Sequence, residues 1–231
     1  MTNRKISNEW GRPMKTAPLQ FLILYGKTGC GKSEILRQIN KRGEQLLDLE
    51  KLAIHNGSAF GGLGKNPQPS QDEFEKKIQE KLSGFNPKLP VWVEYESNYL
   101  GKLQIPDYLI QEMSQSKMIV IDLERQQRVL RIIEGYAQYS NKELSAAISK
   151  VKKKLSQKKY RRTRQAIRQQ DFQSAVSVLL TYYDKVYENG LKNSKCELLG
   201  KLILTGKEVD QHANQLLDFY DTNPLKYENP E

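Results

Sequence analysis

The 231-residue sequence predicts an α/β fold, a three-layer sandwich around a parallel sheet, followed by a basic helical region. Three observations predict it. Short apolar runs alternate with stretches of helical periodicity up to about residue 140, as in strands joined by helical crossovers. A glycine-rich loop follows the first apolar run. The net charge of +10 is concentrated in residues 141–170, where strand signals disappear.

Composition excludes several classes of protein. A hydrophobic fraction of 38% allows a sizeable core. Two cysteines, Cys30 and Cys196, exclude a disulfide scaffold and a four-cysteine zinc site, and two histidines, His55 and His212, are too few for a histidine-built metal centre. The longest apolar stretch, residues 19–25, is far shorter than the roughly 20 residues that span a bilayer. We therefore expect no membrane association and a cytoplasmic, reducing environment.

The first elements follow in order from the N-terminus. Residues 1–18 are polar, and we expect a tail or linker there. Residues 20–25 form an apolar run suited to a buried parallel strand. Residues 34–42 have apolar side chains at helical spacing before Gly43 and predict a helix, and residues 45–49 predict a second strand.

A loop separates these elements from the next helix. Residues 58–70 are rich in Gly and Pro. Ser70 then begins a helix, because Glu73 three residues later completes a capping box. The elements beyond this helix alternate in type. They are a strand over 89–94, a helix over 106–114, a strand over 117–122 and a helix over 124–139.

The region after residue 140 has a different pattern. Apolar side chains between residues 172 and 187 recur at steps of three and four, which predicts an amphipathic helix ending near Gly190. Residues 198–204 fit either a helix or a strand. The sequence therefore predicts three parts, which are a tail (1–18), an α/β domain (19–140) and a basic helical region (141–231).

The basic window holds 11 of the 37 Lys and Arg residues and one acidic residue, Glu143, so the rest of the chain has 26 residues of each sign. A polyanion, most simply a nucleic acid backbone, is the natural partner of such a surface. A solvated helix face is the alternative, and an anionic membrane is disfavoured because few large apolar side chains lie there. The candidate contacts are Lys150, Lys152, Lys153, Lys154, Lys158, Lys159, Arg161, Arg162, Arg164 and Arg168.

The loop after the first strand fits the phosphate-binding pattern G-x-x-x-x-G-K-S, or Walker A motif, at every fixed position. Glycines allow successive N–H groups to face a phosphate, Lys32 supplies a positive charge, and the Ser33 hydroxyl suits Mg²⁺. We interpret Cys30 as a tolerated small residue, with a catalytic thiol as the alternative. The predicted phosphate contacts are Gly26, Lys27, Thr28, Gly29, Cys30, Gly31, Lys32 and Ser33.

Acidic residues follow three of the predicted strands, where a Mg²⁺-linked phosphate site usually has a carboxylate. The pairs are Asp48 with Glu50, Glu94 with Glu96, and Asp122 with Glu124. Glu94 is our first choice because its strand is the most plausible central one, and Asp48 is a possible metal ligand beside Ser33. The alternative is that these acids only cap the following helices.

Three arginines, Arg125, Arg128 and Arg131, follow the fourth strand at three-residue steps. They could form a lid over phosphates or pair with surface acids, and the spacing leaves both open. These residues together predict a phosphate-binding domain of the P-loop NTPase or kinase type. An ATP-dependent small-molecule kinase and an RNA-directed NTPase both fit, so ATP or GTP binding stays open.

A longer pattern is more specific. Residues 48–61, 68–71 and 74–75, together with residues 90–97 and 100–101, closely resemble tRNA 2-selenouridine synthase. The resemblance covers residues 24–136 of the chain and is weaker beyond. It concerns the phosphate-loop half of that family.

The resemblance implies a transferase that modifies the wobble uridine of tRNA in two steps. The sulfur of 2-thiouridine is geranylated from geranyl diphosphate, and the S-geranyl group is then replaced with selenium from selenophosphate, giving 2-selenouridine. Both co-substrates carry phosphate for the glycine-rich loop, and tRNA would be the polyanion. His55 and Ser58 are implied contacts near the reacting thiouridine, and Glu94 joins them as a catalytic candidate.

The sequence also departs from the family pattern. Asn56 and Asn98 stand where the family usually has Arg, and Tyr95 replaces an Asp. These departures motivate a further alternative, a non-catalytic tRNA-binding subunit. Bacterial members also carry a rhodanese-like domain with a catalytic cysteine, for which the residues before the loop leave no room. We therefore expect a split or truncated enzyme whose selenium step uses a separate rhodanese-like subunit.

Overall fold

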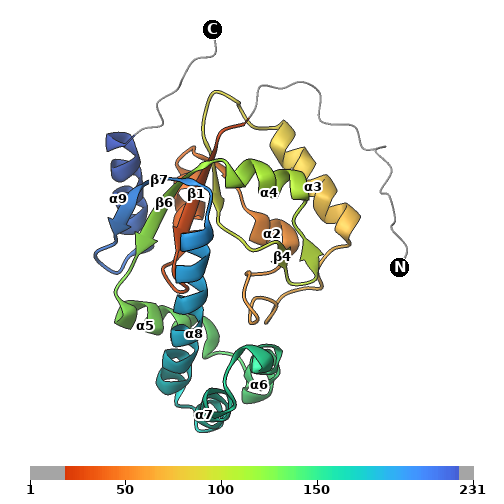
Figure 1. Ribbon diagram of the computed structural model, residues 1–231, viewed down its shortest axis with the longest axis vertical. Helices are drawn as coiled ribbons and strands as arrows, with labels where there is room; N and C mark the ends of the chain where they lie inside the picture. Colours follow the sequence, from red (N-terminus) through yellow and green to blue (C-terminus); the bar gives the residue numbers. More distant parts are fainter. Residues whose placement is uncertain (1–18, 224–231) are drawn as a thin grey trace.

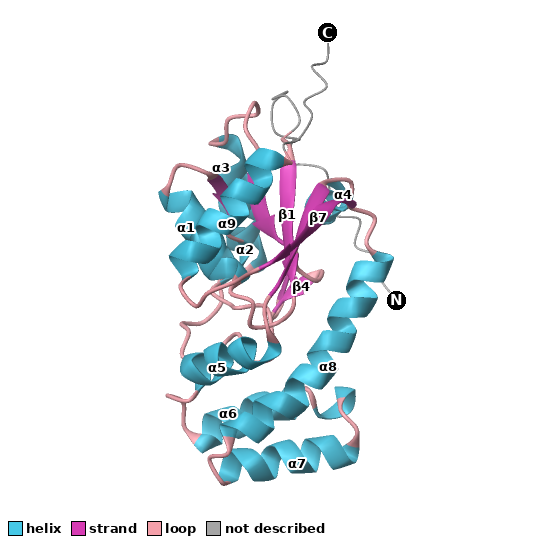
Figure 2. Cartoon of the chain, turned by 90° about the vertical axis from the view of Figure 1, so that its left-hand side faces the viewer, coloured by secondary structure: helices cyan, strands magenta, loops and turns pink. Residues whose placement is uncertain are grey.

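The computed structural model describes residues 19–223, so the predicted tail at 1–18 lies outside the described residues (Figure 1). Its centre is a parallel five-stranded sheet in the order β2-β3-β1-β6-β7. Both faces are covered by helices, which confirms the predicted three-layer α/β fold (Figure 2). The strands are β1 (Phe21–Gly26), β2 (Gln45–Leu47), β3 (Val91–Glu94), β6 (Lys117–Asp122) and β7 (Glu197–Ile203).

Alternation of side chains along the strands builds a core on each face of the sheet. Leu22 and Leu24 of β1 face α1 (Lys32–Lys41) and α9 (Val209–Thr222). Phe21 and Ile23 face α3 (Gln71–Ser83) and α4 (Asp107–Ser114). Because β1 is buried on both faces, its sequence is continuously apolar.

Short elements complete the α/β domain. Asp48 caps α2 (Leu49–Ala53) and therefore ends the second strand earlier than predicted. The predicted capping box is confirmed at Ser70 and Glu73. A small hairpin pairs β4 (Tyr99–Leu100) with β5 (Leu103–Gln104).

The basic region folds as four helical segments beside one end of the α/β domain (Figures 1 and 2). We call them the helical module. They are α6 (Asn141–Lys150), the short 3₁₀ helix η1 (Lys152–Lys154), α7 (Gln157–Arg168) and α8 (Phe172–Asn193). The preceding helix α5 (Arg125–Tyr136) leads into it and ends three residues earlier than predicted.

The predicted helical region 141–231 differs from the structure in its last part. Residues 198–204, which fitted either a helix or a strand, lie almost entirely within β7, and β7 pairs in parallel with β6. Helix α9 follows β7 and packs on α1. Residues 197–222 therefore belong to the α/β domain. The predicted end at Gly190 is also corrected, because α8 continues to Asn193. A β-carbon at Gly190 would lie 2.5 Å from the Tyr25 hydroxyl, so this glycine makes room for a side chain of the sheet.

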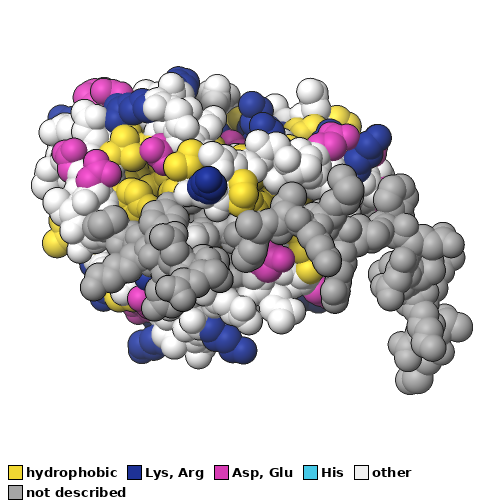
Figure 3. Space-filling view, turned by 90° about the horizontal axis from the view of Figure 1, so that it is seen from above, with side chains coloured by type: hydrophobic (Ala, Val, Ile, Leu, Met, Phe, Trp, Pro, Cys, Tyr) yellow, Lys and Arg dark blue, Asp and Glu magenta, His cyan; other side chains and the backbone are white. Residues whose placement is uncertain are grey.

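The two ends of the molecule differ in charge. Figure 3 shows the end away from the helical module, where acidic, basic and apolar side chains are interspersed. The basic window lies at the opposite end, on α6, η1 and α7. Within residues 19–223, no helix has the length and apolar character needed to cross a membrane.

Candidate functional site

The phosphate loop connects β1 to α1 at the carboxyl edge of the sheet. Gly29 and Gly31 have φ angles of 86° and 81°, in the left-handed region that favours glycine. Gly31 begins α1 without a side-chain cap. The first N–H groups of a helix lack intrahelical acceptors and carry partial positive charge, so this end of α1 suits an anion.

Lys32 and Ser33 contact the carboxylate that the sequence favoured. Lys32 Nζ lies 3.1 Å from Glu94 Oε1 and donates to the Gly26 carbonyl at 2.8 Å. The Ser33 hydroxyl lies 2.6 Å from Glu94 Oε2 and 2.9 Å from Glu50 Oε2. Glu94 ends β3, which pairs directly with β1, so the strand order brings it to the loop.

Three carboxylates gather beside Ser33. Glu50, Glu94 and Glu96 each offer an oxygen within 4.8 Å of the others, and we call them the carboxylate cluster. Burial and the charge of Glu94 raise the pKa of Glu50 to about 7, and burial raises the pKa of Glu96 well above its usual range. Such an oxygen-rich set, next to a hydroxyl, matches the ligands that Mg²⁺ prefers.

Two other strand-end acids lie near the site but are held by ion pairs outside the carboxylate cluster. Asp48, the possible metal ligand, is 2.7 Å from Arg37 Nε and accepts the Lys51 N–H at 2.9 Å as the cap of α2. It lines the same pocket as Ser33 and the carboxylate cluster, but Glu50, not Asp48, contacts the Ser33 hydroxyl. Asp122 pairs with Lys27 of the phosphate loop at 3.1 Å.

Residues 55–58 form a turn against the carboxylate cluster. The His55 N–H bonds to the Glu50 carbonyl at 3.0 Å, and a β-carbon at Gly57 would lie 3.2 Å from oxygens of both Glu50 and Glu96. His55 is buried, and its Nδ1 has no hydrogen-bond partner in the structure. Burial, with the charges of Lys150 and Lys65, lowers its pKa, which favours the neutral imidazole at pH 7.

Ser58, at the end of this turn, lies at an apolar cavity that the sequence did not predict. Thr28 of the phosphate loop also lines it. The cavity measures about 80 Å³, where roughly 10–15 Å³ on the same measure suffices for one water. Its other walls come from the α2–α3 loop and from α5 to α8. They are Phe60, Ile132, Ile133, Tyr136, Ala137, Leu144, Ile167, Phe172, Ala175, Val176, Leu179, Leu180 and Tyr183.

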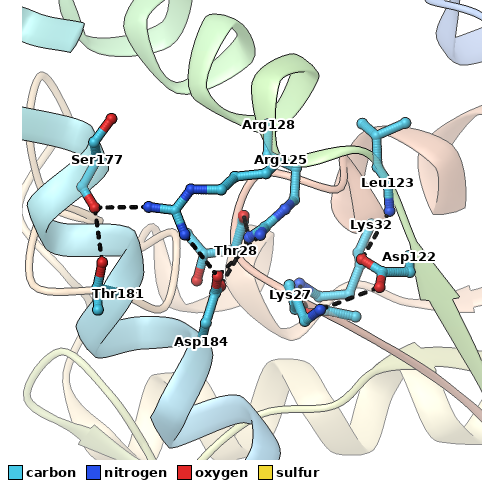
Figure 4. Close-up of polar contacts among 11 residues, drawn as sticks. Lys27, Thr28, Lys32, Asp122, Leu123, Arg125, Arg128, Ser177, Thr181 and Asp184 are labelled. Carbon is cyan, nitrogen blue, oxygen red and sulfur yellow. Dashed lines mark hydrogen bonds and ion pairs between the residues drawn. The ribbon is translucent and has the colours of Figure 1, made fainter. Parts of the chain in front are cut away.

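The three lid candidates on α5 all contact acidic residues. Arg128 is buried, and it bonds to both Asp184 carboxylate oxygens, at 2.8 and 3.0 Å (Figure 4). It also donates to the Thr28 carbonyl at 3.1 Å, so it braces the phosphate loop and is not free to close over a ligand. Arg125 bonds to the Ser177 carbonyl at 2.9 Å, and Arg131 pairs with Glu34.

The basic side chains form the outer surface of the helical module. Tyr160, Ala166 and Ile167 of α7 turn inward to its core, which leaves the charged positions facing outward. Lys159 and Arg164 are half-buried, and the other eight candidate contacts are exposed. Within residues 19–223, none of the ten forms an ion pair, so the positive charge is not neutralised by the fold.

Asp184 was not singled out from the sequence. One signal existed, since this acidic residue interrupts a run of apolar and aromatic positions along α8. Its role depends on Arg128, which is 56 residues away in the chain.

The family model described as "tRNA 2-selenouridine synthase AAA domain" matches residues 19–216. A tRNA 2-selenouridine synthase of Marinobacter nauticus is 31% identical over 211 residues, covering 78% of this chain and 56% of that protein. One of Nitrosomonas europaea is 39% identical over 120 residues, covering 51% of this chain and 31% of that protein. This chain thus spans about half or less of the length of these curated relatives.

Solved structures show more distant similarity. TT1252 from Thermus thermophilus has a TM-score of 0.42 at 15% identity, covering 88% of this chain and 97% of that one. A shikimate kinase from Acinetobacter baumannii has a TM-score of 0.39 at 15% identity, covering 91% of this chain and 97% of that one.

Proposed function

Because the chain belongs to the family of tRNA 2-selenouridine synthase AAA domains, we propose that it is the phosphate-loop part of an enzyme that modifies the wobble uridine of tRNA. It transfers a geranyl group from geranyl diphosphate to the sulfur of 2-thiouridine. With selenophosphate, it then takes part in converting the product to 2-selenouridine. The phosphate loop binds the diphosphate or the selenophosphate, and the helical module binds the tRNA.

The position of the apolar cavity is the observation that supports the geranyl step. Thr28 belongs to both the phosphate loop and the cavity wall, so a ligand with an anionic head and an apolar tail can occupy both at once. The walls on α5 and α8 are aliphatic and aromatic side chains. Binding a hydrocarbon chain against such side chains is favourable, because it removes apolar surface from contact with water. Geranyl diphosphate has this head and tail, whereas ATP does not.

The residues of the loop suit the departure of diphosphate. When the thiouridine sulfur attacks the first carbon of the geranyl group, the carbon–oxygen bond breaks and negative charge develops on the diphosphate. Lys32 and the first N–H groups of α1 stabilise that charge. Lys32 is paired with Glu94 in this structure and can turn from that carboxylate to the ligand.

The carboxylate cluster fits a magnesium ion by the chemistry of its donors. Glu50, Glu94 and Ser33 would hold the ion, with Glu96 next to them. A bound Mg²⁺ supplies positive charge to the phosphate oxygens of the ligand. Gly57, which packs against Glu50 and Glu96, lies between His55 and Ser58 in the chain, and Ser58 also lines the apolar cavity. We propose His55 and Ser58 as the contacts closest to the reacting base.

Selenium transfer uses a thiol that we assign to a rhodanese-like unit, either a separate subunit or a further part of the same protein. Cys30 is fully buried, and burial raises the pKa of its thiol, which disfavours the reactive thiolate. Cys196 precedes β7, so it lies at the edge of the sheet opposite to the phosphate loop. Neither described cysteine is suited to act at the loop.

The test is product analysis. The purified chain is incubated with geranyl diphosphate and tRNA containing 2-thiouridine, and the nucleosides are analysed by mass spectrometry. We expect S-geranyl-2-thiouridine, with the yield lost in Lys32→Met. Absence of this nucleoside, with both substrates bound, contradicts the transferase and supports a non-catalytic tRNA-binding subunit. Turnover of ATP that tRNA does not affect supports a small-molecule kinase instead.

A further inference from the structure

Helix α8 connects the two proposed binding surfaces (Figures 1 and 2). Its first half packs into the core of the helical module, where Ala175 and Leu179 meet side chains of α6 and α7. Its second half reaches β1, since the Tyr25 hydroxyl donates to the Tyr187 carbonyl at 2.8 Å and the two rings stack at 4.6 Å. A helix of 22 residues is about 33 Å long. One helix therefore runs from the core of the helical module to the strand that leads into the phosphate loop.

Asp184 is the point on α8 that reaches the phosphate loop. Its two carboxylate oxygens bond to Arg128, whose guanidinium also donates to the Thr28 carbonyl (Figure 4). The Arg128 side chain is 3% exposed and that of Asp184 is 16% exposed, so water screens this pair weakly. Charge-assisted bonds with two parallel contacts are among the strongest and most directional in proteins.

At Gly29 the phosphate loop packs tightly against α5. A β-carbon on Gly29 would lie 3.0 Å from the Arg128 carbonyl oxygen and 3.1 Å from the Arg128 Cβ. Arg128 therefore fixes the loop in two ways, through the backbone beneath Gly29 and through the side chain at Thr28. A displacement of α8 that moved Asp184 would change both the orientation of Arg128 and the shape of the anion cradle.

We propose that Asp184 is a positioning residue that couples RNA binding on the helical module to anion binding in the phosphate loop. The inference rests on the proposed function, because it takes RNA as the ligand of the module. RNA bound to the helical module holds α8 in place and so stabilises the contact of Asp184 with Arg128, and this contact holds the loop in the form that receives the anion. By linkage, the anion strengthens RNA binding by the same factor.

The second arginine near Asp184 contributes less. Arg125 lies 3.7 Å from Asp184 Oδ2, and its side chain is 50% exposed. An ion pair of that length and exposure is weak in water. The coupling is thus assigned to Arg128, which is buried and makes three hydrogen bonds.

The experiment measures the dissociation constant of inorganic diphosphate with and without a saturating tRNA transcript, at fixed ionic strength. In the wild-type chain we expect RNA to strengthen diphosphate binding by about fivefold or more, the lower end of typical couplings. In Asp184→Asn the ratio falls below about twofold, and Asp184→Glu restores part of it. The matched control is Glu188→Gln, which removes one negative charge from an exposed position one turn along α8.

Each possible result either supports or refutes the proposed coupling. If the wild-type chain binds both ligands independently, or if Asp184→Asn keeps the full ratio, the coupling is refuted while the proposed function stands. If the wild-type chain fails to bind diphosphate or tRNA, the proposed function fails and the coupling fails with it. Should Asp184→Asn not fold, Arg128→Lys gives the same comparison, because a lysine retains the charge but cannot contact Asp184 twice and Thr28 at once.

Discussion

Replacing Lys32 with methionine tests the anion site directly. Methionine keeps most of the length of the side chain and removes its charge. In the structure the Lys32 ammonium contacts Glu94 and the Gly26 carbonyl, both of which lie at the cradle. The variant therefore removes the cation from the centre of the proposed diphosphate site, while the glycines that shape the loop stay in place.

The magnitude follows from the contact that is lost. A hydrogen bond to a charged group contributes about 1.5–3 kcal/mol. Its loss should raise the dissociation constant of diphosphate roughly 12- to 140-fold, at about 1.4 kcal/mol per factor of ten. In the variant, Glu94 also loses its ion pair with Lys32 and repels the incoming anion. The loss should therefore exceed the lower end of this range.

Titration calorimetry with inorganic diphosphate measures the effect. The matched control is Lys27→Met, which removes one positive charge from the same loop, at a side chain that is 23% exposed and paired with Asp122. We expect the control to weaken binding by less than about fivefold, because Asp122 already holds Lys27 in a partly exposed ion pair. Equal losses in the two variants would show that diphosphate responds only to overall charge, and unchanged affinity in Lys32→Met would refute the site.

Four other changes have definite expected results. Arg128→Met leaves Asp184 without its main partner, so it should cost about 3–5 kcal/mol of unfolding free energy in chemical denaturation; a loss under 1 kcal/mol would contradict a buried pair. Glutamines in place of the lysines at 152–154 should flatten the slope of log affinity for tRNA against log salt by about 0.7–0.9 per lost phosphate contact, and an unchanged slope would place the RNA elsewhere. The pKa of Glu50, raised to about 7 in the folded protein, means that the folded chain binds more protons than the unfolded chain between about pH 4.5 and 7. Stability should therefore fall as pH rises through this window, and Glu50→Gln should reduce that dependence in thermal unfolding without abolishing it, because the pKa of Glu96 is raised as well. Ala175→Leu, which adds bulk to the cavity wall, should weaken binding of geranyl diphosphate and leave inorganic diphosphate unchanged; equal affinity for both ligands would exclude the cavity as the tail site.

Local pattern was enough to predict most of the α/β domain. The run at residues 20–25 is apolar without alternation because β1 is buried on both faces. The loop at residues 26–33 was recognisable because its glycines and Lys32 meet requirements that few other residues satisfy. Glu94 was the favoured acid because its strand was expected to be central, and β3 is indeed hydrogen-bonded on both sides, to β1 and β2.

Features that depend on distant residues were not predictable in the same way. The apolar side chains of residues 198–204 follow neither the helical nor the strand repeat clearly. These residues form a strand because β6 offers an unpaired edge. The carboxylate cluster combines Glu50 with Glu94 and Glu96, from segments more than forty residues apart, whereas the sequence indicated Asp48 and not Glu50 as the possible metal ligand. The apolar cavity arises where α5 and the α2–α3 loop meet the helical module, so no single segment contains its pattern.

The account depends most on a single site that receives both the head and the tail of a prenyl diphosphate. A crystal structure of the chain with an unreactive thio analogue of geranyl diphosphate tests this directly. We expect the diphosphate oxygens within hydrogen-bonding distance of Lys32 and the loop N–H groups, and the hydrocarbon chain between Ile132 and Leu180. An analogue bound with its chain in solvent, or with its diphosphate away from the loop, would contradict the account.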